Sequence, residues 1–396
     1  MYPTETAKPI MRILYIQATL VPPPVGGVND RFLPLSDHIE GEILQPVWFR
    51  TPEEIEAVFG PGSYPVYAIG KFRYHWFPAY DGPREKSRFA TFWFYVTKGW
   101  SLCRERKVDC IVVYSHMTTA VCAVLLKFLT GSRLITEVMI GPDRAYLTDR
   151  KTPGLKDRLR HLYSTICLYV TTLACNRVHL LYPGQLESYS MLRGTAASVF
   201  HDYTPVSGIK RHVIAEEDDA NRPYIVLAGA PWYRKGADLA VEAFSRLSPD
   251  YPRWRLLIVG YFPEGTLQNL AAKCDRIEVV TPKPHAEMMR IVTDAEVMLL
   301  PSRNEGLPRI LIEGMAAGLP LVGSDIAGIP VLIRDGENGF VVGDGDVDML
   351  ERRLRELLSD ASLRRRMGQR SYEMAQATLT ERVYVEQFTR MLHDTV

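Results

Sequence analysis

Apolar and polar positions alternate along the second half of the chain in a repeating order of short apolar runs and helix-period segments. The apolar runs that predict strands are 223–230, 254–260, 276–281, 296–302, 320–325 and 339–343. The segments with helical periodicity between them are 238–247, 264–274, 285–295 and 308–318. Strands that alternate with helices form βαβ units around a parallel sheet, so this half predicts a Rossmann-like domain.

The first half begins with the same pattern and loses it over residues 40–107, which are rich in aromatic side chains. Strands are expected at 11–20, 109–116, 132–138, 179–184 and 197–203, with a helix at 118–130. The predicted fold class is therefore α/β, with two Rossmann-like domains that face each other across a cleft. The predicted units are an N-terminal domain (1–204), a polar linker (205–222), a C-terminal domain (223–378) and a last helix (379–396) that returns to the N-terminal domain.

Composition narrows the class of protein further. The 396 residues are 46% hydrophobic and 23% charged, with a net charge of +1, so nothing in the composition favours nucleic acid as a partner. The six cysteines form no CxxC pair, which favours reduced thiols and a cytoplasmic protein. The N-terminal apolar run is too short for a secretory signal. No stretch reaches the roughly 18 apolar residues of a membrane span, and the longest runs, 120–129 and 165–175, are interpreted as buried helix.

Two glutamates stand eight residues apart where a predicted strand runs into a helix. Glu305 follows the strand 296–302, and Pro308 suits the first helical position because proline has no N–H to lose there. Eight residues at 3.6 per turn return Glu313 to within about 80° of Glu305, where a carboxylate can accept hydrogen bonds from a ribose diol. An exposed helix end attracts anions and hydroxyl-rich ligands, and the N–H groups expected to be free there are those of Gly306, Leu307 and Arg309. The alternative is that Glu305 only favours the helix dipole and that Glu313 is a surface residue.

The stretch 301–342 resembles the E-x7-E signature of family 4 glycosyltransferases, which are retaining enzymes of the GT-B fold. The resemblance covers nearly all of 222–345. In the first half of the chain it is weaker and is limited to the strand order and a few loop residues. It implies that Glu305 holds hydroxyls of the donor sugar and that Glu313 binds the ribose of the sugar nucleotide. It also implies that the backbone touches the sugar and the diphosphate at Gly306, Leu307, Pro308 and Arg309.

Residues 229–236 resemble the basic strand-to-helix loop of the same family. Lys235 falls on the family's lysine, which neutralises the departing diphosphate, and a fixed cation there would lower the barrier. The alternative for Lys235 is a solvated lysine at a helix start. The family's arginine position holds Ala230, and Arg234 is the neighbouring cation that could replace it. Without such a replacement the chain could bind a nucleotide and transfer sugar slowly or not at all.

The first half supplies weaker candidates. Gly26 and Gly27 resemble the family's glycine-rich loop, which lets the backbone approach the diphosphate and the acceptor; the alternative is a plain turn. His116 ends a predicted strand, where the family has a histidine that reaches the donor sugar; the alternative is a core histidine. Glu137 and Arg144 stand at and after the next strand end and are expected to face the acceptor pocket, which the resemblance assigns to the N-terminal domain.

The expected chemistry needs no cofactor or metal. No carboxylate nucleophile stands out on the first-half loops, and the family delivers the acceptor hydroxyl on the face of the leaving diphosphate, so the residues position groups and stabilise charge. No DxD motif stands at a strand end. The Asp-rich stretch 343–348 lacks the spacing of an EF-hand and is interpreted as a turn before a helix. The co-substrate is expected to be a UDP- or GDP-sugar.

The leading hypothesis is a retaining glycosyltransferase that moves a hexose from a nucleoside diphosphate sugar to an acceptor hydroxyl, in polysaccharide, glycolipid or glycoconjugate synthesis. A catalytically weak nucleotide-sugar-binding homologue or partner subunit is the alternative that Ala230 motivates. A dinucleotide-dependent oxidoreductase is disfavoured because no G-x-G-x-x-G follows a strand. The acceptor could be a sugar, a lipid-linked sugar or a small molecule. Residues 83–109 mix basic ends with aromatic side chains and suit either a core helix or a helix on an anionic membrane surface, which would place the protein peripherally at the inner face.

Overall fold

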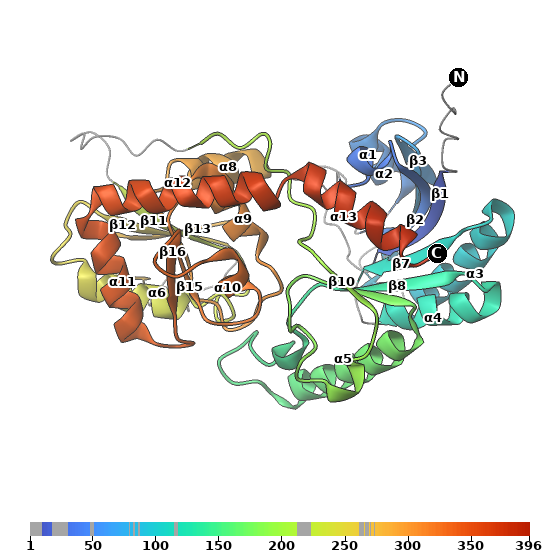
Figure 1. Cartoon of the computed structure of the whole chain (residues 1–396), viewed down its shortest axis with the longest axis horizontal. Helices are drawn as coiled ribbons and strands as arrows, with labels where there is room; N and C mark the ends of the chain where they lie inside the picture. Colours follow the sequence, from blue (N-terminus) through green and yellow to red (C-terminus); the bar gives the residue numbers. More distant parts are fainter. Residues whose placement is uncertain are drawn as a thin grey trace, which may run out of the picture.

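The computed structural model describes residues 10–17, 31–47, 51–78, 80–81, 84–85, 88–114, 118–211, 223–260, 265, 269, 271–272 and 274–396. Two α/β domains, each built around its own sheet, lie side by side along the long axis of the molecule (Figure 1). The predicted fold class of two Rossmann-like domains is confirmed.

The sheet of the N-terminal domain has the strand order β10-β9-β8-β7-β1-β2-β4-β3. Its strands are β1 (Met11–Gln17), β2 (Ile39–Val47), β3 (Val66–Ile69), β4 (Phe72–Pro78), β7 (Cys110–Tyr114), β8 (Arg133–Val138), β9 (Arg177–Leu180) and β10 (Ala197–Val199). All neighbours pair in parallel except β3 and β4, and the short strands β5 (Tyr80–Asp81) and β6 (Arg84–Glu85) pair separately. The central strand β1 is almost entirely buried, because helices cover both faces of the sheet.

Successive side chains of β1 point to opposite faces and so enter two different cores. Leu14 and Ile16 pack in the core beneath the helices α3 (Arg88–Arg106) and α4 (Thr118–Thr130). Ile13 and Tyr15 pack on the other face with α1 (Phe32–Leu35) and α13 (Glu381–His393). The remaining helices of this domain are α1 (Phe32–Leu35), α2 (Pro52–Phe59), η1 (Pro142–Arg144), α5 (Leu155–Ala174) and η2 (Ser190–Leu192).

The irregular pattern of residues 40–107 has a physical cause. Strands β2 and β4 carry charged residues that pair with one another across the sheet. Glu42 accepts a hydrogen bond of 3.1 Å from Nε of Arg73 and lies 2.7 Å from Nε2 of His75. Charges that are neutralised by a neighbouring strand break the apolar run of each strand, so the sequence alone shows no strand there.

The sheet of the C-terminal domain is fully parallel, with the order β13-β12-β11-β14-β15-β16. Its strands are β11 (Tyr224–Ala228), β12 (Arg255–Val259), β13 (Ile277–Val280), β14 (Val297–Leu300), β15 (Leu321–Ser324) and β16 (Gly339–Val342). Its helices are α6 (Ala237–Leu247), α8 (His285–Thr293), α9 (Arg309–Ala317), α10 (Ile329–Leu332), α11 (Val347–Ser359) and α12 (Ala361–Thr378). The chain runs outward from β11 to β13 and then returns to β14 beside β11. In such sheets ligands bind at the carboxyl ends of the two strands where the order reverses.

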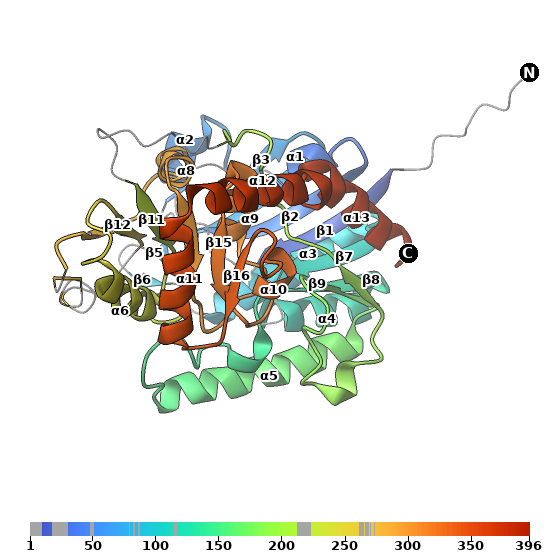
Figure 2. The ribbon, with the colours of Figure 1, turned by 60° about the vertical axis from the view of Figure 1, so that its left-hand side comes forward.

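Two segments cross between the domains. The first includes residues 200–211: residues 200–206 are mostly buried, and residues 207, 208, 210 and 211 of the predicted linker are exposed. The second runs from α12 into α13 (Glu381–His393), which leaves the C-terminal domain and packs on the first sheet through Tyr384 and Phe388 (Figure 2).

Two details of the predicted elements need correction, and a third is confirmed. Helix α9 begins at Arg309, and Pro308 is its N-cap with extended backbone (ψ 112°), so Glu305 lies in the preceding loop and not on the helix. The apolar runs 120–129 and 165–175 are helical, yet they are not buried throughout: both leave large apolar side chains exposed. The turn predicted for 343–348 is confirmed, because the side chain of Asp346 caps α11 by accepting a bond of 2.8 Å from the N–H of Met349.

Candidate functional site

A lysine and a glutamate meet at the carboxyl ends of the two central strands of the C-terminal domain. Lys235 follows β11 and Glu305 follows β14, and Nζ of the lysine donates to Oε1 of the glutamate over 2.6 Å. The hydroxyl of Ser302 donates to the same oxygen over 2.8 Å. Both charged side chains are largely buried. The solvated-lysine interpretation of Lys235 is therefore wrong for this structure.

Two glycines hold Lys235 in this place. Gly229 has φ +128°, and a Cβ there would lie 2.7 Å from Cε of Lys235, so the lysine stem needs the bare backbone beneath it. Gly236 has φ +69°, and a Cβ there would overlap the carbonyl oxygen of Pro301 in the neighbouring strand end. Both positions favour glycine because of backbone conformation and space.

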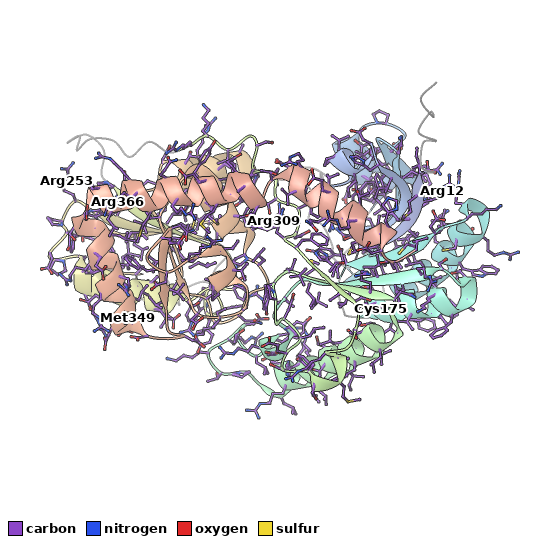
Figure 3. All side chains as sticks on the ribbon, viewed as in Figure 1. Arg12, Cys175, Arg253, Arg309, Met349 and Arg366 are labelled. Carbon is purple, nitrogen blue, oxygen red and sulfur yellow. The ribbon has the colours of Figure 1, made fainter. Side chains whose placement is uncertain are left out.

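The start of α9 lies directly beside this pair. Among the described residues, the N–H groups of Gly306, Leu307 and Arg309 have no backbone acceptor, as expected for a helix end. The Arg309 side chain is exposed and lies between the two domains (Figure 3). Burial raises the pKa of the Tyr114 phenol in the N-terminal domain, and the positive charge of Arg309 acts in the opposite direction. Arg309 of one domain thus interacts electrostatically with Tyr114 of the other.

Glu313 is buried on α9, so the alternative of a surface residue is wrong. Burial raises the pKa of its carboxyl to about 7, and the positive charge of Arg309 acts in the opposite direction. No hydrogen bond to this carboxyl exists within the part of the chain that the structure describes. A buried carboxyl without a partner is costly, which makes Glu313 ready to accept hydrogen bonds from a ligand.

The N-terminal domain touches the site at the loop after β8. The N–H of Gly141 donates to the carbonyl oxygen of Glu305 over 2.7 Å, and Nδ2 of Asn304 donates to the carbonyl of Gly141 over 3.1 Å. A Cβ on Gly306 would overlap the carbonyl oxygen of Met139. The two domains are thus in backbone contact at the candidate site itself.

Two predicted site arginines also join the domains. Arg234 forms an ion pair of 3.0 Å with Asp149 and donates to the carbonyl of Ala230 over 3.0 Å. Arg144 forms an ion pair with Asp344 and donates to the carbonyl of Arg303 over 3.3 Å. In this arrangement the charge of Arg234 is neutralised by a carboxylate of the other domain.

The structure corrects the expectation for Glu137. Its side chain is 0% exposed and lies inside the N-terminal domain, where its carboxylate accepts from Tyr15 and forms an ion pair of 3.0 Å with Arg31. His179 contacts the same carboxylate at 3.0 Å. Burial alone would raise the pKa of Glu137, but Arg31, His179 and Tyr15 together lower it to about 2. Glu137 therefore faces this interior network and not an open acceptor pocket.

The same network ties the last helix to the N-terminal domain. Arg31 is fully buried, and its Nε donates to the hydroxyl of Tyr384 on α13 over 2.8 Å. Its guanidinium also lies 5.6 Å from the ring centroid of Phe388. No sequence pattern singled out Arg31, because its partners are 16, 106 and 353 positions away. Gly26, Gly27 and His116 lie outside the described residues.

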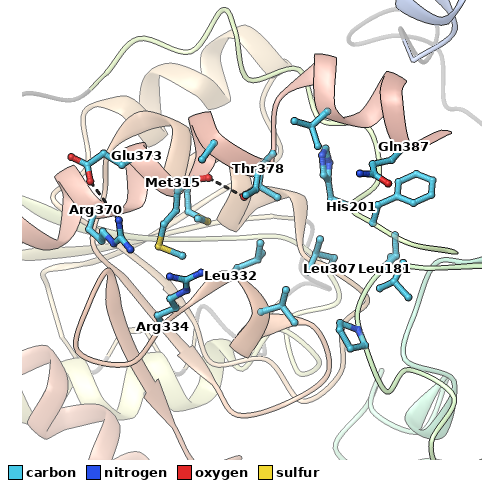
Figure 4. Close-up of a pocket in the computed structure, with 18 residues that line it drawn as sticks. Leu181, His201, Leu307, Met315, Leu332, Arg334, Arg370, Glu373, Thr378 and Gln387 are labelled. Atoms are coloured by element: carbon cyan, nitrogen blue, oxygen red, sulfur yellow. Dashed lines mark hydrogen bonds and ion pairs between the residues drawn. The ribbon is translucent and has the colours of Figure 1, made fainter. Parts of the chain in front are cut away.

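The cavity found between the domains is separate from the Lys235–Glu305 pair. Its volume is about 600 Å³, and its walls come from both domains and from α13 (Figure 4). Leu307 and Met315 of the α9 region contribute to one wall, and His201 and Gln387 contribute to another. Leu307 thus lines this cavity, whereas Lys235 and Glu305 do not.

The described residues contain neither a metal-binding cluster nor a membrane-spanning helix. No group of three or more histidine, cysteine, aspartate or glutamate side chains in the described ranges is arranged to hold a metal ion. Within those same ranges, no helix combines the length and the apolar character that crossing a bilayer requires.

Comparison with known proteins agrees with this geometry. Residues 210–374 match the family model of glycosyl transferases group 1, which includes Lys235, Glu305 and Glu313. This match covers less than half of the chain, and it shows that residues 210–374 resemble a glycosyltransferase family. The matched region contains the described strands and helices from β11 to α11. The candidate site therefore lies in the part of the chain that resembles the family.

Sequence relatives of the chain match over different lengths. N-acetyl-alpha-D-glucosaminyl L-malate synthase of Bacillus anthracis is 24% identical over 74% of this chain and 76% of that protein. An exopolysaccharide phosphotransferase of Streptomyces coelicolor is 37% identical over 35% of this chain, and the match spans 15% of its own length. D-inositol 3-phosphate glycosyltransferase of Corynebacterium efficiens is 32% identical over 36% of each protein. Two of these three alignments thus cover well under two thirds of the relative.

Solved structures resemble the chain over nearly its whole length. Sucrose-phosphate synthase from Thermosynechococcus elongatus superposes with a TM-score of 0.75 at 16% identity, over 97% of this chain and 98% of that one. HepE from Anabaena in complex with UDP-glucose superposes with a TM-score of 0.65 at 13% identity, over 98% and 100%. At such identities the likeness establishes the shared two-domain fold.

Proposed function

We propose that the protein is a glycosyltransferase that moves a hexose from a nucleoside diphosphate sugar to an acceptor hydroxyl with retention of anomeric configuration. The observation that carries the proposal is the Lys235–Glu305 pair at the strand-order reversal, with the start of α9 beside it. This arrangement offers a buried cation, a carboxylate and free backbone N–H groups within one loop cluster. Those are the groups that a sugar joined to a diphosphate requires.

Each residue has a distinct part in the proposed transfer. Lys235 neutralises charge that develops on the leaving diphosphate, and the N–H groups of Gly306 and Leu307 bind the phosphates. Glu305 exchanges its contact with Lys235 for sugar hydroxyls and thereby orients the anomeric carbon. Glu313 binds the ribose. The acceptor hydroxyl attacks on the face that the diphosphate leaves, and the enzyme contributes position and charge.

The proposal includes no cofactor, since the fixed positive charge near the phosphates comes from Lys235 and from the exposed guanidinium of Arg309. Donors with a UDP or GDP group are the first to test. The solved relative HepE was captured with UDP and glucose, which supports a uridine nucleotide as one choice. Relatives named for colanic acid and amylovoran biosynthesis support a sugar acceptor in polysaccharide or glycoconjugate synthesis. All six cysteines are free, which supports a cytoplasmic location.

A second candidate is a homologue that binds the sugar nucleotide without efficient transfer. It is favoured by Ala230 at the family's arginine position and by the ion pair that occupies Arg234 with Asp149. Unless that pair opens, the leaving diphosphate meets one fewer cation than the family provides.

A panel of UDP-, GDP- and ADP-sugars distinguishes the two candidates. Release of nucleoside diphosphate, followed with and without a sugar acceptor and with a chelator present, reports turnover and metal dependence together. Proton NMR of the new glycosidic bond reports whether the configuration is retained. Tight nucleotide binding in calorimetry without any release of diphosphate would support the binding homologue, and an inverted product would refute the retaining mechanism.

A further inference from the structure

Helix α5 carries its large apolar side chains on its outer side. Seven of them are exposed along its full length: Leu155, Leu159, Leu162, Tyr163, Ile166, Val170 and Leu173. Its inner side instead includes four polar residues among the six that are buried: Asp157, Ser164, Thr171 and Thr172. A helix of a soluble domain normally has the reverse arrangement. Both ribbon views show α5 at the edge of the molecule, with no labelled element over its outer side (Figures 1 and 2).

The exposed residues form one continuous stripe. At about 100° per residue, their positions from 155 to 173 fall within an arc of about 100°. Lys156 lies at one margin of this arc and Arg158 lies beyond the other, and both are exposed. An apolar stripe with basic residues at both margins is the arrangement of a helix that lies in the plane of a membrane interface.

The neighbouring helices α3 and α4 also expose large apolar side chains next to basic ones. Helix α4 packs between α3 and α5 and exposes Phe128 (74%) near its end, and α3 exposes Phe89, Trp93 and Trp100. The Arg104 guanidinium lies 4.8 Å from the Trp100 ring centroid, so basic and aromatic groups are again adjacent. Tryptophan and arginine at the margin of an apolar surface suit the level of lipid headgroups.

The charge of this layer differs from that of the whole chain. Helices α3, α4 and α5 contain eight lysines and arginines and two acidic residues, which gives a net +6, whereas the whole chain carries +1. One of the two acidic residues, Asp157, is buried and accepts from the N–H of Gly154 over 3.0 Å. The layer as a whole is therefore positively charged, and two exposed basic residues of α5 that contribute to this charge, Lys156 and Arg158, lie beside its apolar stripe.

We propose that the outer face of α5, with the adjoining ends of α3 and α4, binds the surface of an anionic lipid bilayer. The apolar stripe would enter the boundary between headgroups and acyl chains, while Lys156 and Arg158 pair with lipid phosphates. A protein partner would need a long apolar groove edged with acidic residues to match this surface. An anionic bilayer supplies both features along any direction in its plane.

The loop before α5 connects this surface to the contact between the two domains. Nδ1 of His161 lies 3.1 Å from the carbonyl oxygen of Ala145, and the Arg160 guanidinium lies 4.9 Å from the Tyr146 ring centroid. The same loop carries Arg144, which contacts the C-terminal domain. A bilayer under α5 would thus lie one helix away from the domain junction. The proposal goes beyond glycosyl transfer, because lipid binding by this face does not require a sugar nucleotide.

Sedimentation of the full chain with sucrose-loaded vesicles tests the proposal. Vesicles of phosphatidylcholine alone are compared with vesicles that also contain phosphatidylglycerol, at low and at high salt. We expect binding to the anionic vesicles, weaker binding to the neutral ones, and a loss of the difference at high salt because of screening. Equal sedimentation with both kinds of vesicle at low salt would overturn the proposal.

A matched pair of variants locates the surface. Leu159→Gln together with Leu162→Gln should lower binding to anionic vesicles by about tenfold, because two side chains no longer gain from leaving water. Leu33→Gln is the control: Leu33 is 57% exposed and Leu162 is 56% exposed, but Leu33 lies on α1 at the opposite face of the sheet. Binding of the double variant at the level of the parent would refute the assignment of the surface to α5.

Two further measurements separate the other outcomes. Sedimentation velocity without lipid reports self-association, and a dimer of the parent that the α5 double variant abolishes would assign this face to a second copy and refute lipid binding. Thermal unfolding and UDP calorimetry on each variant show whether the fold and the donor site are intact. A chain that binds vesicles but no nucleoside diphosphate would contradict the proposed transfer and leave the lipid surface standing.

Discussion

Lys235 and Glu305 are 70 positions apart in the chain, and their Nζ and Oε1 atoms lie 2.6 Å apart in the fold. The contact exists because β11 and β14 are neighbours in the sheet, although β12 and β13 lie between them in the sequence. Each charged residue follows one of these strands, so the strand-order reversal brings both to one edge. The pair thus follows directly from the topology of the C-terminal domain.

Loss of either member of this pair should reduce turnover strongly. We expect Lys235→Ala and Glu305→Gln each to lower the rate of diphosphate release by about a hundredfold or more, because a fixed charge acting on the transition state is lost. The measurement is steady-state kinetics with the best donor of the sugar-nucleotide panel, alongside thermal unfolding.

The control for this prediction is Lys283→Ala, which removes a lysine from an i,i+4 pair with Glu287 at the domain surface. It should leave both rate and stability nearly unchanged, since such pairs contribute little. Near-parental rates in both Lys235→Ala and Glu305→Gln would contradict the site assignment.

The stability of the ligand-free protein should depend on Glu313 between mildly acidic and neutral pH. Burial raises the pKa of this carboxyl from 4.5 to about 7, so the folded state holds a proton that the unfolded chain has released. Its contribution is fully present below pH 4.5 and is lost as the pH rises through 7. Relative to Glu313→Gln, the parent should therefore lose about 3 kcal/mol of unfolding free energy over this range. Urea unfolding of both proteins at several pH values measures the difference, and a difference that is constant with pH would argue against a buried, protonated Glu313.

A methyl group at Gly306 should force the domains apart. Its Cβ would overlap the carbonyl oxygen of Met139, and neither backbone can move without breaking the contact between Gly141 and Glu305. We expect Gly306→Ala to increase the radius of gyration in small-angle scattering and to lower turnover. Gly194→Ala is the control, because a Cβ there meets no atom within 4 Å. Unchanged scattering and turnover in Gly306→Ala would show that the domains do not close in this way.

The buried network around Arg31 should make the N-terminal domain sensitive to acid. Glu137→Gln removes one of two carboxylates that pair with the fully buried Arg31 guanidinium; the other, Asp202, lies 3.4 Å away, and the loss should cost about 3 kcal/mol of unfolding free energy at neutral pH. The pKa of Glu137 is lowered from 4.5 to about 2, so its stabilisation is present above pH 4.5 and is lost as the pH falls toward 2. Denaturant unfolding of the parent should show this loss, and Glu137→Gln should not.

Glu386→Gln provides the comparison for Glu137. It removes an exposed carboxylate that pairs with Arg382 on α13, and it should change stability by less than about 0.5 kcal/mol. Equal effects of the two substitutions would mean that burial of the Arg31 network does not govern its contribution.

Much of the C-terminal domain could be predicted from the sequence because its signals are local. The predicted bounds of β14 and α9 differ from those of the structure by one or two residues at each end. Glu305 and Lys235 could be singled out because residues that follow parallel strands gather at one edge of a sheet. Fewer elements of the N-terminal domain could be predicted, because β2 and β4 carry charges that are neutralised only when the two strands pair in the sheet.

The sequence by itself determined the alternation of strands and helices, the two-domain class and the polar residues at the strand ends, since each depends on neighbours within a few positions. The tertiary structure alone decided that Glu137 pairs with Arg31 in the interior, that Gly306 packs against Met139, and that the outer face of α5 is apolar. Those features depend on which distant segments cover a side chain. Periodicity along the chain shows that a helix has an apolar side, but it does not show whether that side faces the core.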